Sequence, residues 1–163
     1  MTETFKSTAT TDNSRWYMGH LFTWLVTAKQ TGGKFSILEA TIRKGLEPPP
    51  HIHALESETY YILEGDMRFF VGDRVFEARP GDCVYLPANV QHGFTLESET
   101  AKCIILIEPG GLEDFFAEFS IPAPELQLPP VPSEPPAPEL IRQFVATLAT
   151  YGVTSPGETV EAC

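Results

Sequence analysis

The sequence predicts an all-β domain, a barrel or sandwich, with a helical extension after it. Between Trp16 and Glu108 the chain consists of short runs rich in β-branched and aromatic residues, separated by Gly, Pro, Asp and Asn. This rhythm is typical of β-barrels and β-sandwiches. After Glu108 the apolar residues change to helical spacing. The length of 163 residues matches one domain with its own core.

Eight runs are the predicted strands of this domain. The turns between them, among them Gly65-Asp66 and Pro80-Gly81-Asp82, supply residues that tolerate a positive φ. The predicted strands cover residues 17–28, 34–43, 59–64, 67–71, 74–79, 83–87, 91–97 and 101–108.

Two helices are predicted after residue 110, with a proline-rich segment between them. Residues 122–138 hold eight of the fifteen prolines, so this stretch can be neither a helix nor a central strand, and we expect an extended strap. Pro138 suits the first turn of the second helix, and Gly152 ends it. The apolar stripes of the two helices are Leu112, Phe115, Phe116 and Phe119, and then Leu140, Ile141, Phe144, Val145, Leu148 and Tyr151.

These elements predict a β-barrel domain over residues 15–110 and a helical extension over residues 111–152. We expect the second helix to pack on the barrel or on a partner subunit. The remaining residues, 1–14 and 153–163, are expected to be flexible termini.

Charge and composition exclude several classes of partner. The formal net charge of −11 repels phosphate backbones and disfavours binding to nucleic acid. The apolar run of residues 21–28 is too short to span a bilayer. Cys83, Cys103 and Cys163 form no CxxC pair and are interpreted as free thiols. Together these features predict a cytoplasmic protein without membrane contact.

Three of the four histidines and one acid have the spacing of a metal site. His51 and His53 lie one residue apart, so on an extended segment both side chains project to the same face. Glu58 follows five positions later, and His92 lies on a distant predicted strand. Such a set of nitrogen and oxygen ligands suits one divalent transition metal: Fe, Mn, Ni, Co, Cu or Zn. The fourth histidine, His20, is interpreted as a surface or satisfied core residue.

The segment that holds these residues resembles the cupin superfamily. GLEPPPHIHALESETYYILEG, from Gly45 to Gly65, matches the first cupin motif, G-x5-HxH-x4-E-x6-G, at every defined position. GDCVYLPANVQHGFTL resembles the second motif, with Asn89 in place of a glycine and Leu96 in place of an asparagine. The resemblance implies a double-stranded β-helix, or jelly-roll, barrel in which His51, His53, Glu58 and His92 bind one metal.

The segment after the barrel, EPGGLEDFFAEFSIPAPELQLPP, is similar to that of quercetinase-like cupins. This resemblance implies a small metal-dependent dioxygenase acting on flavonols. Glu58 is then the predicted catalytic residue, as the general base that takes a proton from a substrate hydroxyl.

The strand register predicts the lining of the pocket. If Glu58 faces inward, so does Glu64, together with a set of mostly apolar side chains. Arg68 and Arg74 fall outside this set, which favours a small apolar or aromatic substrate over a phosphorylated one. Two alternatives stay open: a non-catalytic small-ligand-binding protein, and a metal-dependent isomerase or hydrolase. The predicted substrate-binding residues are Tyr60, Ile62, Met67, Phe69 and Phe94.

The opposite face of the same hairpin is also partly apolar. Tyr61, Leu63, Arg68 and Phe70 are predicted to point outward, where a second subunit could cover them. The sequence therefore favours a homodimer.

Overall fold

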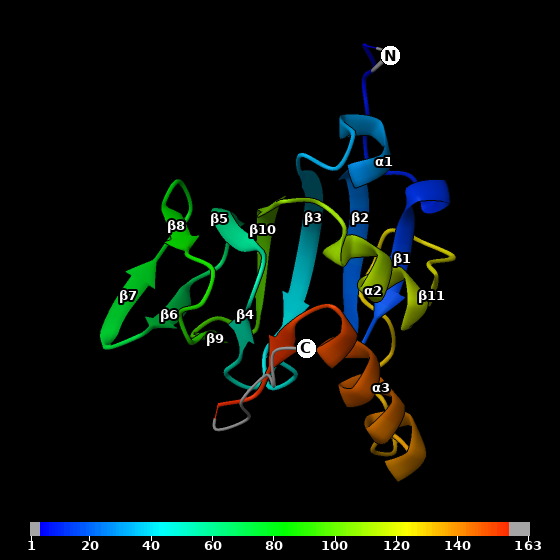
Figure 1. Ribbon diagram of the computed structural model, residues 1–163. Coiled ribbons are helices and arrows are strands. Elements are labelled where there is room, and N and C mark those ends of the chain that lie inside the picture. The colour runs from blue at the N-terminus through cyan, green and yellow to red at the C-terminus, as the bar shows by residue number, and fades with distance from the viewer. Residues whose placement is uncertain (1–3, 157–163) are drawn as a thin grey trace.

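A computed structural model of the chain describes residues 4–156 and contains a barrel built from antiparallel sheets (Figure 1). The large sheet has seven strands and the small one has three, and a further pair of short strands lies near the barrel mouth. This jelly-roll architecture confirms the predicted all-β class. In spatial order, the large sheet contains β11 (Ser120–Pro122), β1 (Ser14–Tyr17), β2 (His20–Val26), β3 (Ser36–Arg43), β10 (Thr100–Glu108), β5 (Ser57–Glu64) and β8 (Cys83–Leu86).

The remaining strands frame the other side of the barrel. The small sheet has the order β7 (Arg74–Ala78), β6 (Met67–Val71) and β9 (His92–Leu96), and the short pair consists of β12 (Val153–Thr154) and β4 (Ile52–His53). The helices are α1 (Ala28–Thr31), α2 (Leu112–Glu118) and α3 (Pro138–Thr150), with one 3-10 turn at Thr11–Asn13. Among the described residues, none of these helices combines the length and the apolar character that a membrane crossing requires.

The first predicted strand, residues 17–28, is in fact a hairpin followed by a helical turn. Met18 and Gly19 both have a positive φ, 48° and 89°, and form the two-residue turn between β1 and β2. Such turns match the twist of the paired strands. The prediction was wrong here because Met is rarely found with a positive φ, so only Gly19 marked the turn.

Alternating burial along the central strands builds the core. The side chains of β3 alternate strictly between buried and half-buried positions, and β10 repeats this pattern beside it. Because successive side chains of a strand point to opposite faces, one face of each strand enters the barrel. Burying each large apolar side chain contributes roughly 1.5–3 kcal/mol.

The hairpin of β5 and β6 places most side chains as predicted. Tyr60 and Ile62 are buried, whereas Tyr61 and Leu63 are exposed on the outer face. Glu64 is exposed, contrary to its predicted inward position. A register shift in the pairing with β10, between Lys102 and Cys103, interrupts the alternation just before Glu64.

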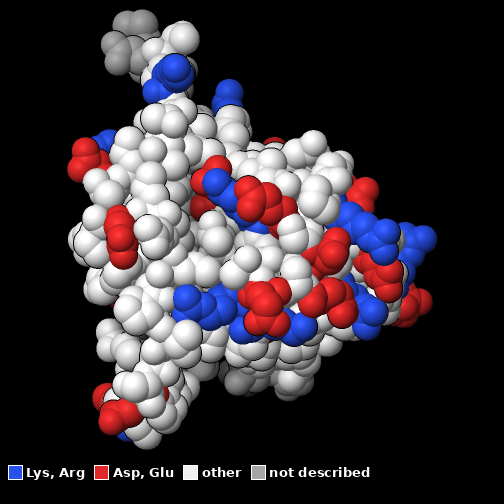
Figure 2. All heavy atoms as spheres, turned by 180° about the vertical axis from the view of Figure 1, so that it is seen from behind, with Lys and Arg blue, Asp and Glu red and all other residues white. Residues whose placement is uncertain are grey.

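Charged side chains on the outer surface are mixed in sign. Arg68 points outward, as predicted, and its guanidinium lies 3.2 Å from Glu77 and 3.4 Å from Glu97. The face in Figure 2 shows basic and acidic side chains interspersed, without a continuous basic patch.

The C-terminal extension folds back onto the barrel. The strap over residues 130–137 is exposed and leads into α3, which packs through Phe144 and Leu148. Three other members of its predicted apolar stripe stay exposed by 44–48%: Leu140, Ile141 and Val145. The helix is therefore only half covered.

The predicted flexible termini differ from the structure at both inner ends. Val153 and Thr154 form β12 and pair with the strand that carries His53. At the other end, Asn13 accepts a hydrogen bond from the Thr10 backbone, and Ser14 is already buried in β1. Strand pairing orders Val153 and Thr154 against β4 and Ser14 against Thr23 of β2, and a local sequence pattern does not reveal such pairing. Residues 1–3 and 157–163 of the predicted termini, including Cys163, lie outside the described residues.

Candidate metal centre

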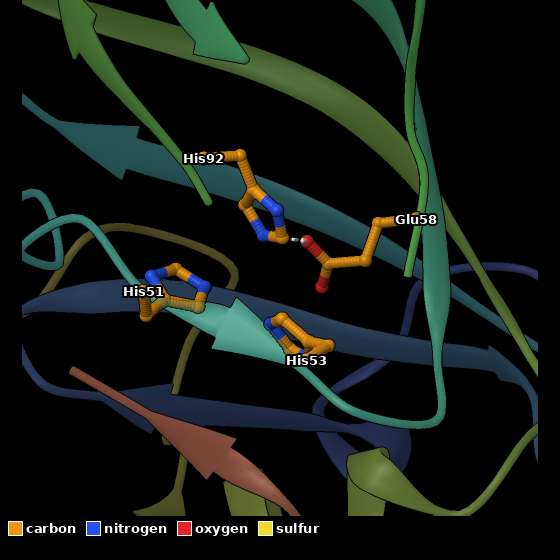
Figure 3. A group of neighbouring side chains, drawn as sticks. All are labelled: His51, His53, Glu58 and His92. Carbon is orange, nitrogen blue, oxygen red and sulfur yellow. Dashed lines mark ion pairs between the residues drawn. The ribbon is translucent and has the colours of Figure 1, made fainter. Parts of the chain in front are cut away.

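Three strands bring the four candidate ligands to one point. His53 lies on β4, Glu58 begins the inward face of β5, and His92 begins β9 (Figure 3). An isolated bridge joins His51 to His92 through two backbone hydrogen bonds of 2.9 Å, so the two histidine segments are fixed side by side. The ligand atoms of the four side chains all lie within 4.8 Å of one another. The structure thus gathers the residues that the sequence singled out.

Backbone carbonyls orient two of the imidazole rings. Nδ1 of His51 lies 2.9 Å from the carbonyl oxygen of Pro49, and Nδ1 of His92 lies 2.9 Å from that of Val90. Because a carbonyl only accepts, each Nδ1 carries the proton and each Nε2 keeps its lone pair. This tautomer is the one that a metal ligand needs.

The unsatisfied nitrogens fit a metal. Nε2 of His53 and Nε2 of His92 are buried and have no hydrogen-bond partner among the described residues. Leaving a buried polar atom unpaired costs about 1–3 kcal/mol. A divalent cation between these nitrogens and the Glu58 carboxylate would satisfy them. The cluster of three imidazoles and one carboxylate is therefore able to bind a metal.

Burial keeps two of the histidines neutral. Removal from water lowers the pKa of His51 and of His92 from 6.5 to about 4. Burial also lowers the pKa of His53, but the carboxylates of Glu56 and Glu58 outweigh it, so the pKa is raised. Neutral imidazoles bind metals, and His51 and His92 are ready to do so at pH 7.

A cavity of about 290 Å³ opens beside this cluster. His51, His53 and Glu58 line one side, and most of the remaining wall is apolar. Two of the predicted substrate-binding residues, Tyr60 and Phe94, line the cavity.

The other three predicted substrate-binding residues, Ile62, Met67 and Phe69, are buried in the core and do not line the cavity. Alternation identified their inward direction but not their depth. Phe69 packs against the rings of Tyr60 and Phe94 at centroid distances of 5.3 and 5.7 Å, so it fills the interior beside the two lining residues.

Known proteins resemble this chain over the barrel. The cupin domain family matches residues 38–108, and the solved structure of an RmlC-like cupin from Shewanella frigidimarina has a TM-score of 0.56 at 20% identity. That match covers 71% of this chain and 99% of the other. These comparisons show that residues 38–108 match the cupin domain family and that the chain has a cupin fold.

Two curated relatives of this chain are quercetin 2,3-dioxygenases. The protein of Bacillus subtilis is 33% identical over 94 residues, which cover 58% of this chain and 28% of that protein. The protein of Aspergillus japonicus is 29% identical over 103 residues, covering 59% and 29%. The chain thus spans less than a third of the length of either enzyme.

The two departures from the second cupin motif have structural explanations. Asn89 has a φ of 62°, the left-handed conformation that Asn adopts more easily than other residues with a side chain, so it replaces the motif glycine without losing the turn. Leu96 is buried in the core, where it lies opposite Met67 of β6.

His20 also lines the cavity, but its ring is fully used. Nε2 lies 3.0 Å from the Leu46 carbonyl, and the Arg43 backbone N–H donates to Nδ1 over 3.2 Å. The side chain is buried, so the interpretation as a satisfied core histidine is confirmed.

The far wall of the cavity was not predicted from the sequence. This wall comes from outside the two motifs: Tyr17 on β1, Leu112 and Phe115 on α2, and Phe144 and Leu148 on α3. Their apolar stripes were visible in the sequence, but the spacing of apolar residues does not reveal which surface they pack against. Only the packing of both helices across the barrel mouth places them beside the metal centre.

Proposed function

We propose that this protein is a metal-dependent dioxygenase that acts on a small apolar or aromatic substrate, as quercetinases do. The observation that carries the proposal is that a complete His/Glu ligand set lies beside a cavity whose walls are mostly apolar. The similarity to two quercetin 2,3-dioxygenases supports the same reaction class.

Each residue of the centre has a distinct task in this proposal. His51, His53 and His92 hold the metal, and Glu58 is the fourth ligand. When bound, the metal supplies a Lewis acid that polarises a substrate hydroxyl or carbonyl oxygen. Glu58 takes the proton of the substrate hydroxyl as general base. Its carboxylate accepts a long hydrogen bond of 3.5 Å from the Tyr60 hydroxyl, which keeps it directed at the centre.

The cavity wall favours an uncharged substrate. Among the residues that the structure describes, no Lys or Arg lines the cavity, and Glu47 and Glu58 contribute its only carboxylates. Phosphorylated sugars and nucleotides need cationic groups to hold phosphate. The wall thus argues against an isomerase or hydrolase of phosphorylated compounds and for planar aromatic molecules that pack against Phe94 and Phe116.

Non-catalytic binding of a small ligand is the alternative function. It rests on the same cavity, because holding an apolar ligand needs the walls but no reaction. The two functions differ in the fate of the ligand. Mass spectrometry of a flavonol after long aerobic incubation with the metal-loaded protein separates them: an oxygenated product supports the enzyme, and unchanged ligand supports the binding protein.

The deciding experiment measures oxygen consumption. Protein is purified without added metal, its metal content is determined by elemental analysis, and it is then incubated with flavonols, catechols and β-dicarbonyls with and without air. We expect oxygen uptake with at least one flavonol, and loss of that uptake in Glu58→Gln. Glu99→Gln, which removes an exposed acid, is the control. No uptake with any compound at full metal occupancy would refute the dioxygenase.

A homodimer and a cytoplasmic location stay proposals. Exposed Tyr61 and Leu63 on β5 and Phe70 on β6 support the dimer, because a second copy would remove them from water. Cys83 and Cys103 are both free thiols, in keeping with a reducing compartment. Sedimentation equilibrium of wild type and Tyr61→Lys tests the dimer. The substitution should weaken dimerisation.

A further inference from the structure

Glu56 is a buried acid outside the ligand set. It lies between β4 and β5, is only 6% exposed, and its Oε2 has no hydrogen-bond partner among the described residues. A buried carboxylate is expensive unless a partner compensates it. The cupin motif specifies no residue type at this position, so Glu56 calls for an explanation from its surroundings.

Glu56 forms an ion-pair contact with a candidate metal ligand. Oε2 of Glu56 lies 3.6 Å from Nδ1 of His53, and that nitrogen also lacks a hydrogen-bond partner among the described residues. Two unpaired buried atoms thus face each other. We propose that Glu56 is the positioning residue of His53: its carboxylate accepts a hydrogen bond from Nδ1–H and directs Nε2 at the metal.

The other two imidazoles show the same arrangement with weaker acceptors. Nδ1 of His51 and Nδ1 of His92 each face a neutral backbone carbonyl at 2.9 Å. Of the three Nδ1 atoms, only that of His53 faces a carboxylate, and hydrogen bonds to ionised acceptors are about twice as strong as those between neutral groups. His53 is therefore the most strongly oriented and most electron-rich ligand of the three.

The backbone around Glu56 is held from two sides. The Ala54 N–H donates to the Gly152 carbonyl over 2.9 Å, and the Asn89 N–H donates to the His53 carbonyl over 2.7 Å. These bonds fix the start of the segment that carries Glu56. The contact with His53 must shorten from 3.6 Å to about 2.9 Å to become a hydrogen bond. A small side-chain rotation is sufficient, because the backbone already places the two groups face to face.

Metal affinity tests this inference directly. The dissociation constant for Zn²⁺ is measured by competition with a chelator in wild type, Glu56→Gln, Glu56→Ala and Glu56→Asp. We expect Glu56→Gln and Glu56→Ala to weaken binding by about 10- to 100-fold, with partial recovery in Glu56→Asp. Glu99→Gln removes the same charge at an exposed position and should bind as wild type. Glu56→Gln within twofold of wild type would overturn the proposal.

A second measurement is independent of metal and of catalysis. Nitrogen NMR of histidine-labelled, metal-free protein at pH 8.5 reports which ring nitrogen of His53 carries the proton, and His53→Gln assigns the signal. We expect the Nδ1–H tautomer in wild type and a shift toward Nε2–H in Glu56→Ala. An Nε2–H tautomer in wild type refutes the positioning role even if Zn²⁺ fails to bind. The inference rests on the metal centre of the proposed function but not on its oxygenase chemistry. A protein without oxygenase activity could therefore still show the positioning role of Glu56, and an active oxygenase could lack it.

Discussion

Val153 lies opposite His53 in an antiparallel pair of short strands, so the C-terminal segment is hydrogen-bonded to a strand that carries a candidate metal ligand. The same segment lines the cavity with Val153 and Thr154. The C-terminal extension is therefore part of the site rather than an appendage to the barrel. Its integrity should matter for metal binding as well as for stability.

Gly152→Ala tests this connection. Gly152 has a φ of 75°, and an added Cβ would lie 3.3 Å from the Ala54 Cβ. We expect a loss of about 1–2 kcal/mol in the free energy of unfolding and a measurable rise in the Zn²⁺ dissociation constant. Gly33→Ala is the matched control, because Gly33 has a φ of 82° but open space around the added Cβ. It should lose similar stability with unchanged Zn²⁺ affinity. Equal Zn²⁺ affinity in both variants would contradict the coupling.

Single ligand variants should lose metal, whereas the buried non-ligand histidine should not. We expect His51→Ala, His53→Ala and His92→Ala each to reduce the metal content measured by elemental analysis. His20→Gln breaks the hydrogen bonds to Leu46 and Arg43, so it should lower the melting temperature but keep the metal. If His20→Gln lost its metal while the three ligand variants kept theirs, the metal site would not be the cluster of His51, His53 and His92.

Metal should stabilise the wild-type fold. At a free metal concentration of about one hundred times the dissociation constant, the stabilisation is about 2.7 kcal/mol. Thermal unfolding before and after chelation measures it, with the removal of metal checked by elemental analysis. An unchanged melting temperature would show that the four residues do not form a working site.

The pH dependence of the metal-free protein follows from its histidines. The pKa of His51 and of His92 is about 4 in the folded state and about 6.5 when unfolded, so the unfolded chain binds more protons between these values. Their contribution to stability is complete above pH 6.5 and is lost as the pH falls toward 4. His53 has a raised pKa and acts in the opposite sense. With two groups against one, we expect a net loss of a few kcal/mol toward pH 4.

Urea unfolding in the presence of a chelator at several pH values measures this loss. The double variant His51→Gln/His92→Gln should show a flatter pH dependence between pH 4 and 6.5. The same slope in wild type and double variant would mean that other groups dominate acid unfolding.

The helix α3 should influence ligand affinity through one face only. Leu148 lines the cavity, whereas Leu140 on the same helix is 44% exposed and does not line it. We expect Leu148→Ala to weaken binding of quercetin, used as an apolar probe, by about 1–2 kcal/mol or roughly 5- to 30-fold. Leu140→Ala should bind as wild type. Calorimetry on metal-loaded protein measures both, and equal affinities would exclude a role for α3 in the cavity wall.

Local patterns in the sequence were sufficient for the barrel and the ligand set. Alternation with a period of two defines which side chains of a strand share a face, and it placed His51 and His53 together. Glu58, five positions later, lies on the next strand, β5. His92 could be added because the second motif resembles a known one. The strand over residues 67–71 was predicted with its observed bounds for the same local reason.

The tertiary structure determined which inward-facing side chains line the cavity, because sequence periodicity gives only the direction of a side chain. Alternation showed that Tyr60 and Ile62 face inward, but only packing shows that Tyr60 borders the cavity while Ile62 lies in the closed core. The pairing of Val153 with His53 and the wall formed by α3 depend on contacts between residues far apart in the chain. Such contacts form through backbone hydrogen bonds and apolar burial that no local pattern encodes. The sequence by itself therefore identified the candidate ligands, and the folded chain determined the cavity beside them.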